Sequence, residues 1–180
     1  WFYAPGYASQ QELSLRRMEE LTGFRFNIEK QGLLKGIMKD SGSETGIDKY
    51  QKTIFTVQPG EGIRTLATGK ENLEGKTVMA QKNFGTWTSV FSSISGIPPS
   101  LWRDIYKRAG VHIYSESDDV ISANESWLMI HTRTAGNKQI YLPARCKKVT
   151  EITTEKIIGE NIDSFTYKIP QHRTAVFLLE

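Results

Sequence analysis

The hydrophobic pattern at the start of the chain predicts a strand, a helix and a second strand. Residues 1–4 (WFYA) form a short apolar run that ends at a Pro-Gly turn. This pattern is typical of a strand buried on both faces. The following segment has apolar positions at helical spacing, N-cap candidates at Ser9 and Ser14, and Gly23 where the helix would end. Residues 24–28 alternate between apolar and polar positions. This succession favours a parallel sheet with a helix packed on it.

The pattern is weak over residues 29–51, where four glycines in a polar context predict a loop with one helical turn around residues 33–38. A helix is expected over residues 96–110, because a proline lies near its start and a glycine at its end. Residues 111–114 (VHIY) predict another short strand. Three clear strands precede that helix, at residues 53–57, 77–82 and 88–93.

After residue 115 the helical period disappears, and we place a domain boundary near this point. Several short strands at regular spacing suggest an antiparallel sandwich. The expected fold class is therefore α/β followed by all-β. The predicted strands of the second part cover residues 119–123, 126–132, 138–142, 147–152, 164–169 and 174–179.

Composition and charge narrow the function only slightly. The 180 residues are 38% hydrophobic and 24% charged, with a formal net charge of +3, which is typical of a globular chain. No run of Lys or Arg exceeds two residues, so the sequence shows no nucleic-acid footprint. No apolar stretch approaches the roughly 20 residues that span a membrane. The single cysteine excludes an internal disulfide framework and a thiolate metal cluster.

Residues with catalytic or metal-binding chemistry are scattered along the chain. The three histidines lack metal-ligand spacing, and Cys146 lacks the strand-to-helix elbow of a nucleophile. The acidic segment 116–119 is typical of a solvated turn, and Glu125 is expected in a packing or turn role rather than as a glycosidase acid. We therefore expect no catalytic residue, no metal site and no cofactor. Core packing is the expected role of the four tryptophans, at positions 1, 87, 102 and 127.

Three stretches resemble the C-terminal half of large bacterial β-galactosidase-like glycoside hydrolases. They read WFYAPGYAS…SLRRMEELTGFRF, then TSVFSSISGIPPSLWRDIYKRAGVHIYSESDDVISANESWLMIHT, then KQIYLPARCKKVTEI…FTYKIPQHRTAVFLL. In that group a catalytic TIM barrel precedes a class I glutamine amidotransferase-like domain, often called the β-galactosidase trimerisation domain, and a small C-terminal β-sandwich. The resemblance implies an incomplete flavodoxin-like (amidotransferase-like) parallel sheet with helices over residues 1–115, truncated at its N-terminus. It also implies a small antiparallel β-sandwich over residues 116–180.

The resemblance further implies a non-catalytic structural and oligomerisation region of a hydrolase acting on β-galactoside-like carbohydrates, with the catalytic barrel absent from this chain. Tyr3, Gly6 and Tyr7 would lie at the carboxyl end of a strand, where open α/β sheets bind ligands, so they are the expected substrate- or interface-proximal residues. The implied partners are the barrel of the same polypeptide, the carbohydrate substrate, and further copies in a homo-oligomer such as a trimer. The compartment stays open between the bacterial cytoplasm and the periplasm or medium.

Two other functions stay open at this point. A stand-alone carbohydrate-binding or interaction module would present an exposed row of Trp and Tyr side chains. A degenerate amidotransferase-like enzyme would need a nucleophile paired with a histidine, but the turn after the first strand reads Ala4-Pro5-Gly6-Tyr7 and contains no cysteine.

Overall fold

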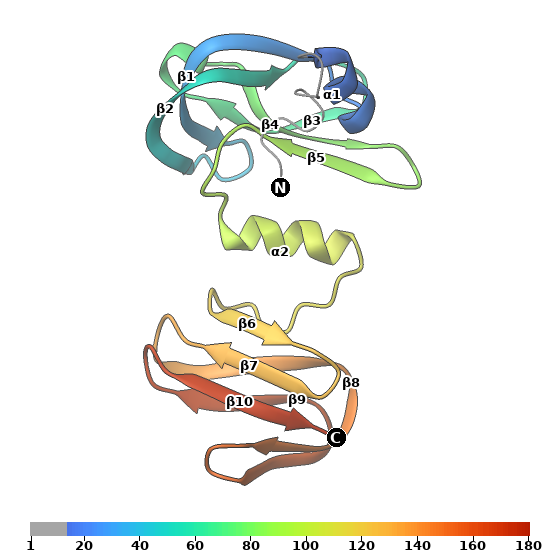
Figure 1. Ribbon diagram of the computed structural model, residues 1–180, viewed down its shortest axis with the longest axis vertical. Coiled ribbons are helices and arrows are strands. Elements are labelled where there is room, and N and C mark those ends of the chain that lie inside the picture. Colours follow the sequence, from blue (N-terminus) through green and yellow to red (C-terminus); the bar gives the residue numbers. More distant parts are fainter. Residues whose placement is uncertain (1–13) are drawn as a thin grey trace. The chain divides into compact units, whose positions relative to one another are not determined.

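The computed structural model describes residues 14–180, which divide into two compact units (Figure 1). The first unit ends at Ile97, and the second runs from Pro98 to Glu180. The predicted strand at residues 1–4 lies outside the described residues. The elements of the first unit are α1 (Leu15–Thr22), β1 (Phe26–Met38), β2 (Glu44–Val57), β3 (Ile63–Gly69), the 3-10 helix η1 (Glu71–Leu73), β4 (Thr77–Asn83) and β5 (Thr88–Ser92). Those of the second are α2 (Pro99–Arg108), β6 (Val120–Ala123), β7 (Trp127–His131), β8 (Gly136–Glu151), β9 (Lys156–Ile169) and β10 (Thr174–Leu179).

The first helix forms where the capping residues predict it. The Ser14 side chain accepts a hydrogen bond from the Arg17 N–H at 3.4 Å, and Gly23 ends the helix in a left-handed conformation with φ of 73°. Met18 is buried in the core of the first unit, whereas Leu21 is 60% exposed. The helix boundaries are therefore confirmed, but the buried stripe is narrower than the sequence pattern predicts.

The strands of the first unit form a small antiparallel barrel. Their order is β2-β1-β3-β4-β5, and one further residue pair, Val57 with Thr77, joins β2 to β4. The first four strands therefore close on one another, while β5 extends the sheet beyond β4. The contact between β2 and β4 closes the barrel, so the backbone groups at that point are paired instead of forming open strand edges. The helix α1 contributes Met18 to a buried apolar cluster. The other members of this cluster are Phe24, Phe26, Phe55, Val57, Ala80 and Phe91.

The predicted parallel sheet is wrong. Every pairing between the named strands is antiparallel, so residues 14–115 contain no flavodoxin-like (amidotransferase-like) sheet. The main cause is the segment 29–51, for which the sequence predicts a loop and which instead forms most of the β1–β2 hairpin. The chain after α1 therefore turns back on itself at once, whereas a parallel sheet needs a crossover connection.

Glycines in β1 explain why these strands are hard to recognise. Gly32 is buried, and a Cβ atom there would lie 2.4 Å from Leu73 Cδ1. A Cβ atom on Gly36 would lie 2.8 Å from the carbonyl oxygen of Thr68. Both glycines thus permit the close approach of neighbouring segments to a strand, although glycine in a sequence usually signals a turn.

The second unit contains one continuous antiparallel sheet in the order β6-β7-β10-β8-β9, instead of the two sheets of a sandwich (Figure 1). The strands predicted at 138–142 and 147–152 are both parts of β8, which pairs with β9 on each side of an irregularity between Tyr141 and Cys146. The second half of β8 also pairs with β10. The core consists of Leu128, Ile130, Ile140, Leu142, Val149, Phe165, Ile169, Ala175, Phe177 and Leu179.

A substitution at Gly46 tests the packing of the β1–β2 hairpin. Gly46 has a φ of 105°, and a Cβ atom there would lie 2.1 Å from the carbonyl oxygen of Leu34. We expect Gly46→Ala to lower the free energy of unfolding by about 3 kcal/mol, because the backbone must shift as well as bear strain. Urea unfolding followed by circular dichroism measures this loss.

Gly42→Ala is the matched control, since Gly42 also has a positive φ, of 67°, but no atom lies within 4 Å of its Cβ position. Gly42→Ala should lower the free energy of unfolding by about 1 kcal/mol, which is the penalty of the left-handed backbone conformation alone. Equal losses for the two variants would show that crowding at Gly46 has no effect on stability.

Candidate functional site

The residues predicted to approach a ligand, Tyr3, Gly6 and Tyr7, lie outside the part of the chain that the structure describes. Their role stays a prediction. Within residues 14–180, a buried ion pair and several hydrogen bonds lie together in the second unit, around the connection between α2 and β6.

A buried ion pair anchors this connection to the sheet. Asp119 Oδ2 lies 2.8 Å from Lys138 Nζ, and the two side chains are only 1% and 6% exposed. Asp119 Oδ2 also accepts a hydrogen bond from Ser117 Oγ at 2.7 Å, and Oδ1 accepts one from the Arg133 N–H at 2.8 Å. The prediction of a solvated turn at 116–119 is therefore wrong for Asp119, which binds the start of β8 and the β7–β8 connection at the same time.

The hydrogen bonds decide the charge of this carboxyl group. Burial alone would raise the pKa of Asp119, but hydrogen bonds from Lys138, Ser117 and the backbone of Arg133 outweigh the loss of water, so the pKa lies below its ordinary value of 3.8. Asp119 is therefore a structural anion at neutral pH and has no proton to donate to a reaction.

The segment before β6 runs along the edge of β8. The Tyr141 N–H donates to the Tyr114 carbonyl oxygen at 2.8 Å, and Ser115 Oγ donates to the Gln139 carbonyl oxygen at 2.9 Å. The strand predicted at 111–114 is not formed as such, but these bonds hold the segment in place against the first half of β8. Its side chains consequently have fixed positions.

A hollow of about 380 Å³ lies beside the ion pair, within the second unit. Its volume is near the lower end of the range for small-molecule sites, roughly 300–1,000 Å³. Side chains from α2, from the connection and from β6 line it, and those with polar groups are Arg103, Tyr106, His112, Tyr114, Ser115, Ser117 and Asp119.

Aromatic rings form much of this lining. His112 and Tyr114 meet edge to face with ring centres 4.7 Å apart, and Tyr106 stacks on Trp102 at 5.8 Å. His112 Nε2 lies 3.0 Å from the carbonyl oxygen of Tyr141. Because a carbonyl oxygen only accepts, Nε2 carries the hydrogen, and Nδ1 of the neutral ring is an acceptor.

The charged groups at the margin of the hollow neutralise one another. Arg103 Nη1 lies 2.8 Å from Asp118 Oδ1, and Arg103 Nε lies 3.6 Å from Glu116 Oε2. Lys107 Nζ lies 2.7 Å from Glu116 Oε1. Two cations thus face two anions, and neither sign of charge is in surplus.

The other residues with candidate chemistry have structural partners or lie in turns. Cys146 Sγ is 3.8 Å from the carbonyl oxygen of Ala144, and His131 Nδ1 is 2.9 Å from Thr174 Oγ1. Glu125 is exposed between β6 and β7. Among residues 14–180, no group of three or more His, Cys, Asp or Glu side chains could hold a metal ion. The helices in this range are also too short and too polar to cross a membrane.

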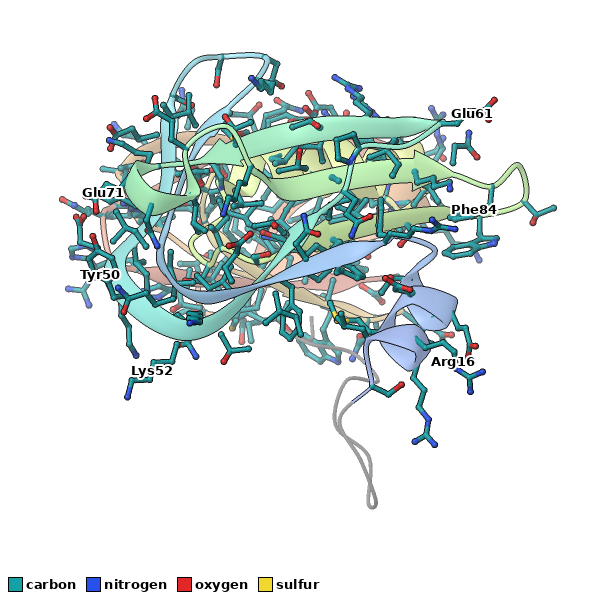
Figure 2. All side chains as sticks on the ribbon, turned by 90° about the horizontal axis from the view of Figure 1, so that it is seen from above. Arg16, Tyr50, Lys52, Glu61, Glu71 and Phe84 are labelled. Atoms are coloured by element: carbon teal, nitrogen blue, oxygen red, sulfur yellow. The ribbon has the colours of Figure 1, made fainter. Side chains whose placement is uncertain are left out.

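Two tryptophans are more exposed than the sequence predicts. Trp87 and Trp127 are 48% and 42% exposed, so the predicted core role is wrong for both. Trp87 lies flat on Phe84 at the β4–β5 turn, with ring centres 4.3 Å apart. Figure 2 shows Tyr50 beside Glu71 at one end of the first unit and Phe84 at the other. Between residues 14 and 97, the exposed aromatic side chains therefore do not form the single row that a stand-alone carbohydrate-binding module would present.

Most residues that line the hollow were not predicted as a site. Tyr106, His112 and Tyr114 lie within nine positions of one another in the sequence, and this local cluster of rings is the signal that could have identified them. The sequence assigns Tyr106 to a helix face and the other two to a strand, which separates them.

Comparisons with known proteins give a match in fold only. No protein-family model matches the sequence, and no curated protein matches it. Among solved structures, a β-galactosidase from Bacillus circulans sp. alkalophilus matches 91% of this chain with a TM-score of 0.54 and 14% identity. A β-galactosidase from Rahnella sp. R3 matches 91% with a TM-score of 0.50 and 10% identity. Gan42B, a GH42 β-galactosidase from G. stearothermophilus, matches 95% with a TM-score of 0.52 and 9% identity.

The chain spans about a quarter of the length of these β-galactosidases, since each match covers 25% of the other chain. The structural likeness therefore agrees with the resemblance to β-galactosidase-like enzymes at the level of a shared domain fold. It does not extend to an amidotransferase-like domain, because the described strands form no parallel sheet.

Replacing Asp119 tests the buried ion pair. We expect Asp119→Asn to lower the free energy of unfolding by about 3 kcal/mol at neutral pH, because Lys138 is left as a buried charge without its partner. Asp163→Asn is the matched control, since Asp163 pairs with Arg145 at 3.0 Å but both side chains are more than half exposed. Its effect should be much smaller, and equal effects would contradict the assigned role of burial.

The same variant tests the pKa of Asp119. Because the pKa in the folded chain lies below 3.8, the carboxylate stabilises the fold above that pH, and this contribution is lost as the pH falls through the lowered pKa. Below about pH 4, stability should therefore fall more steeply for the wild type than for Asp119→Asn. Urea unfolding at a series of pH values measures both slopes, and parallel curves would contradict the assignment.

Proposed function

We propose that this chain is a non-catalytic accessory region of a carbohydrate-active enzyme of the β-galactosidase type. The observation that carries the proposal is the asymmetry of the fold match, in which more than 90% of this chain corresponds to 25% of each β-galactosidase. A catalytic barrel would then belong to another part of the same polypeptide.

The state of the acidic side chains supports a non-catalytic role. Glycoside hydrolysis commonly needs two carboxyl groups that face each other across roughly 5–9 Å, one of them able to donate a proton. Asp119 is held as an anion by Lys138, and Glu116 and Asp118 are paired with cations of α2. Glu125 lies exposed in a turn. Asp119, Glu116 and Asp118 therefore serve the fold of the second unit.

Within this proposal, the two units support the catalytic part and its assembly into an oligomer, and the substrate of the whole enzyme is a β-galactoside-like carbohydrate. Two compact units with separate cores suit such a role, because each folds around its own apolar cluster and presents an independent surface.

The size of the polypeptide in its source cells tests the proposal directly. Because this chain corresponds to 25% of its structural neighbours, antibodies raised against it should detect a polypeptide about four times as long. The purified chain of 20.4 kDa provides the reference band on the same blot. A source polypeptide that migrates with this reference would contradict the proposal.

The non-catalytic assignment has its own assay. The purified chain should hydrolyse nitrophenyl β-galactoside no faster than buffer does, because Asp119, Glu116 and Asp118 are each paired with a cation. A known β-galactosidase at equal concentration is the positive control. Turnover above the buffer rate that follows the chain through purification would show that the region is catalytic.

A further inference from the structure

The hollow of the second unit contains polar side chains whose hydrogen-bonding capacity is unused within the described part of the chain. Tyr106 and Tyr114 each carry a hydroxyl group that makes no hydrogen bond to residues 14–180. His112 uses Nε2 for the bond to Tyr141, which leaves Nδ1 as an acceptor. A ligand in the hollow could therefore accept hydrogen bonds from the two hydroxyl groups and donate one to Nδ1 of His112.

The rings around these atoms suit a ligand with flat apolar faces. Tyr106 is 45% exposed and is backed by the stacked ring of Trp102, so its position is supported from within the helix. The C–H groups on one face of a pyranose ring pack against such an aromatic face, while the hydroxyl groups around its edge need donors and acceptors. The hollow combines both kinds of surface.

The paired charges select a neutral ligand. Arg103 donates to Asp118 and to the Ser117 carbonyl oxygen, and Lys107 is paired with Glu116, so neither of these two cations is available for a phosphate or carboxylate. Asp119 is equally occupied by Lys138. A charged ligand would have to break one of these pairs.

We propose that this hollow binds one neutral pyranose, stacked on Tyr106 and hydrogen-bonded by Tyr114 and His112. The choice of a galactoside as the ligand to test rests on the proposed function. The site is formed before binding, because His112 is fixed by Tyr141 and the connection is fixed by the Asp119–Lys138 pair. Little of the binding free energy is then spent on ordering side chains.

The test is a titration of the purified chain with methyl β-galactoside, followed by protein NMR. We expect saturable shifts with a dissociation constant on the order of 1 mM, as suits a single small ring in an open hollow. Tyr106→Ala should weaken binding at least about tenfold by removing the stacking face. Because Tyr106 is partly exposed, circular dichroism of this variant should match that of the wild type.

Trp87→Ala is the matched control, since it removes an equally exposed aromatic side chain from the first unit. It should leave the titration unchanged. Loss of binding in Trp87→Ala but not in Tyr106→Ala would overturn the proposal and move the site to the Phe84–Trp87 stack. Absence of saturable binding would also overturn it, as would tighter binding of galactose 1-phosphate than of the neutral sugar.

The outcome is independent of the test of the proposed function. A long source polypeptide without sugar binding would refute the hollow as a site and leave the accessory role intact. If the polypeptide is 20.4 kDa in its source cells and the chain binds the sugar, the accessory role would be refuted and the hollow would stand as a binding site.

Discussion

The second unit depends on one buried ion pair. Asp119 and Lys138 lie where apolar packing alone would not decide how the connection before β6 sits against β8. Removing two charges from water is costly, and the cost is offset only because Asp119 also accepts hydrogen bonds from Ser117 and the Arg133 backbone. Few other arrangements of the connection would satisfy all of these groups at once. The pair thereby fixes the geometry of the hollow beside it, including the positions of the rings that line it.

The first unit is held together by a different constraint, the close approach of backbones. Gly32 and Gly36 allow η1 and β3 to pack against β1, and Gly46 lies against the carbonyl oxygen of Leu34. Such contacts bring strands into a tight ring, which one residue pair between β2 and β4 closes. Each unit has its own apolar core, but local geometry in the first depends on the absence of side chains at crowded positions, whereas in the second it depends on a specific polar contact.

The features that could be predicted from the sequence are those decided by near neighbours. Ser14 and Gly23 identify the ends of α1, because capping bonds join residues three or four positions apart. The packing of Leu73 leaves no room for a side chain at Gly32, and this contact between distant segments is one that a local pattern cannot reveal. The same applies to the site. The sequence around Asp119 is typical of an exposed turn, and only the folded chain brings Lys138 beside it. The antiparallel pairing of the first unit, like the hollow, follows from such distant contacts, and an apolar pattern alone does not distinguish a hairpin from a parallel unit.

The segment that carries His112 and Tyr114 also closes a sheet edge. Through Tyr114 and Ser115 it occupies backbone groups in the first half of β8 that would otherwise face solvent. An unprotected strand edge is a template on which a second chain can add a strand. Tyr114 and Ser115 therefore line the hollow and cover this strand edge at the same time. A substitution that loosens this segment would therefore change the hollow and uncover the edge of β8 at the same time.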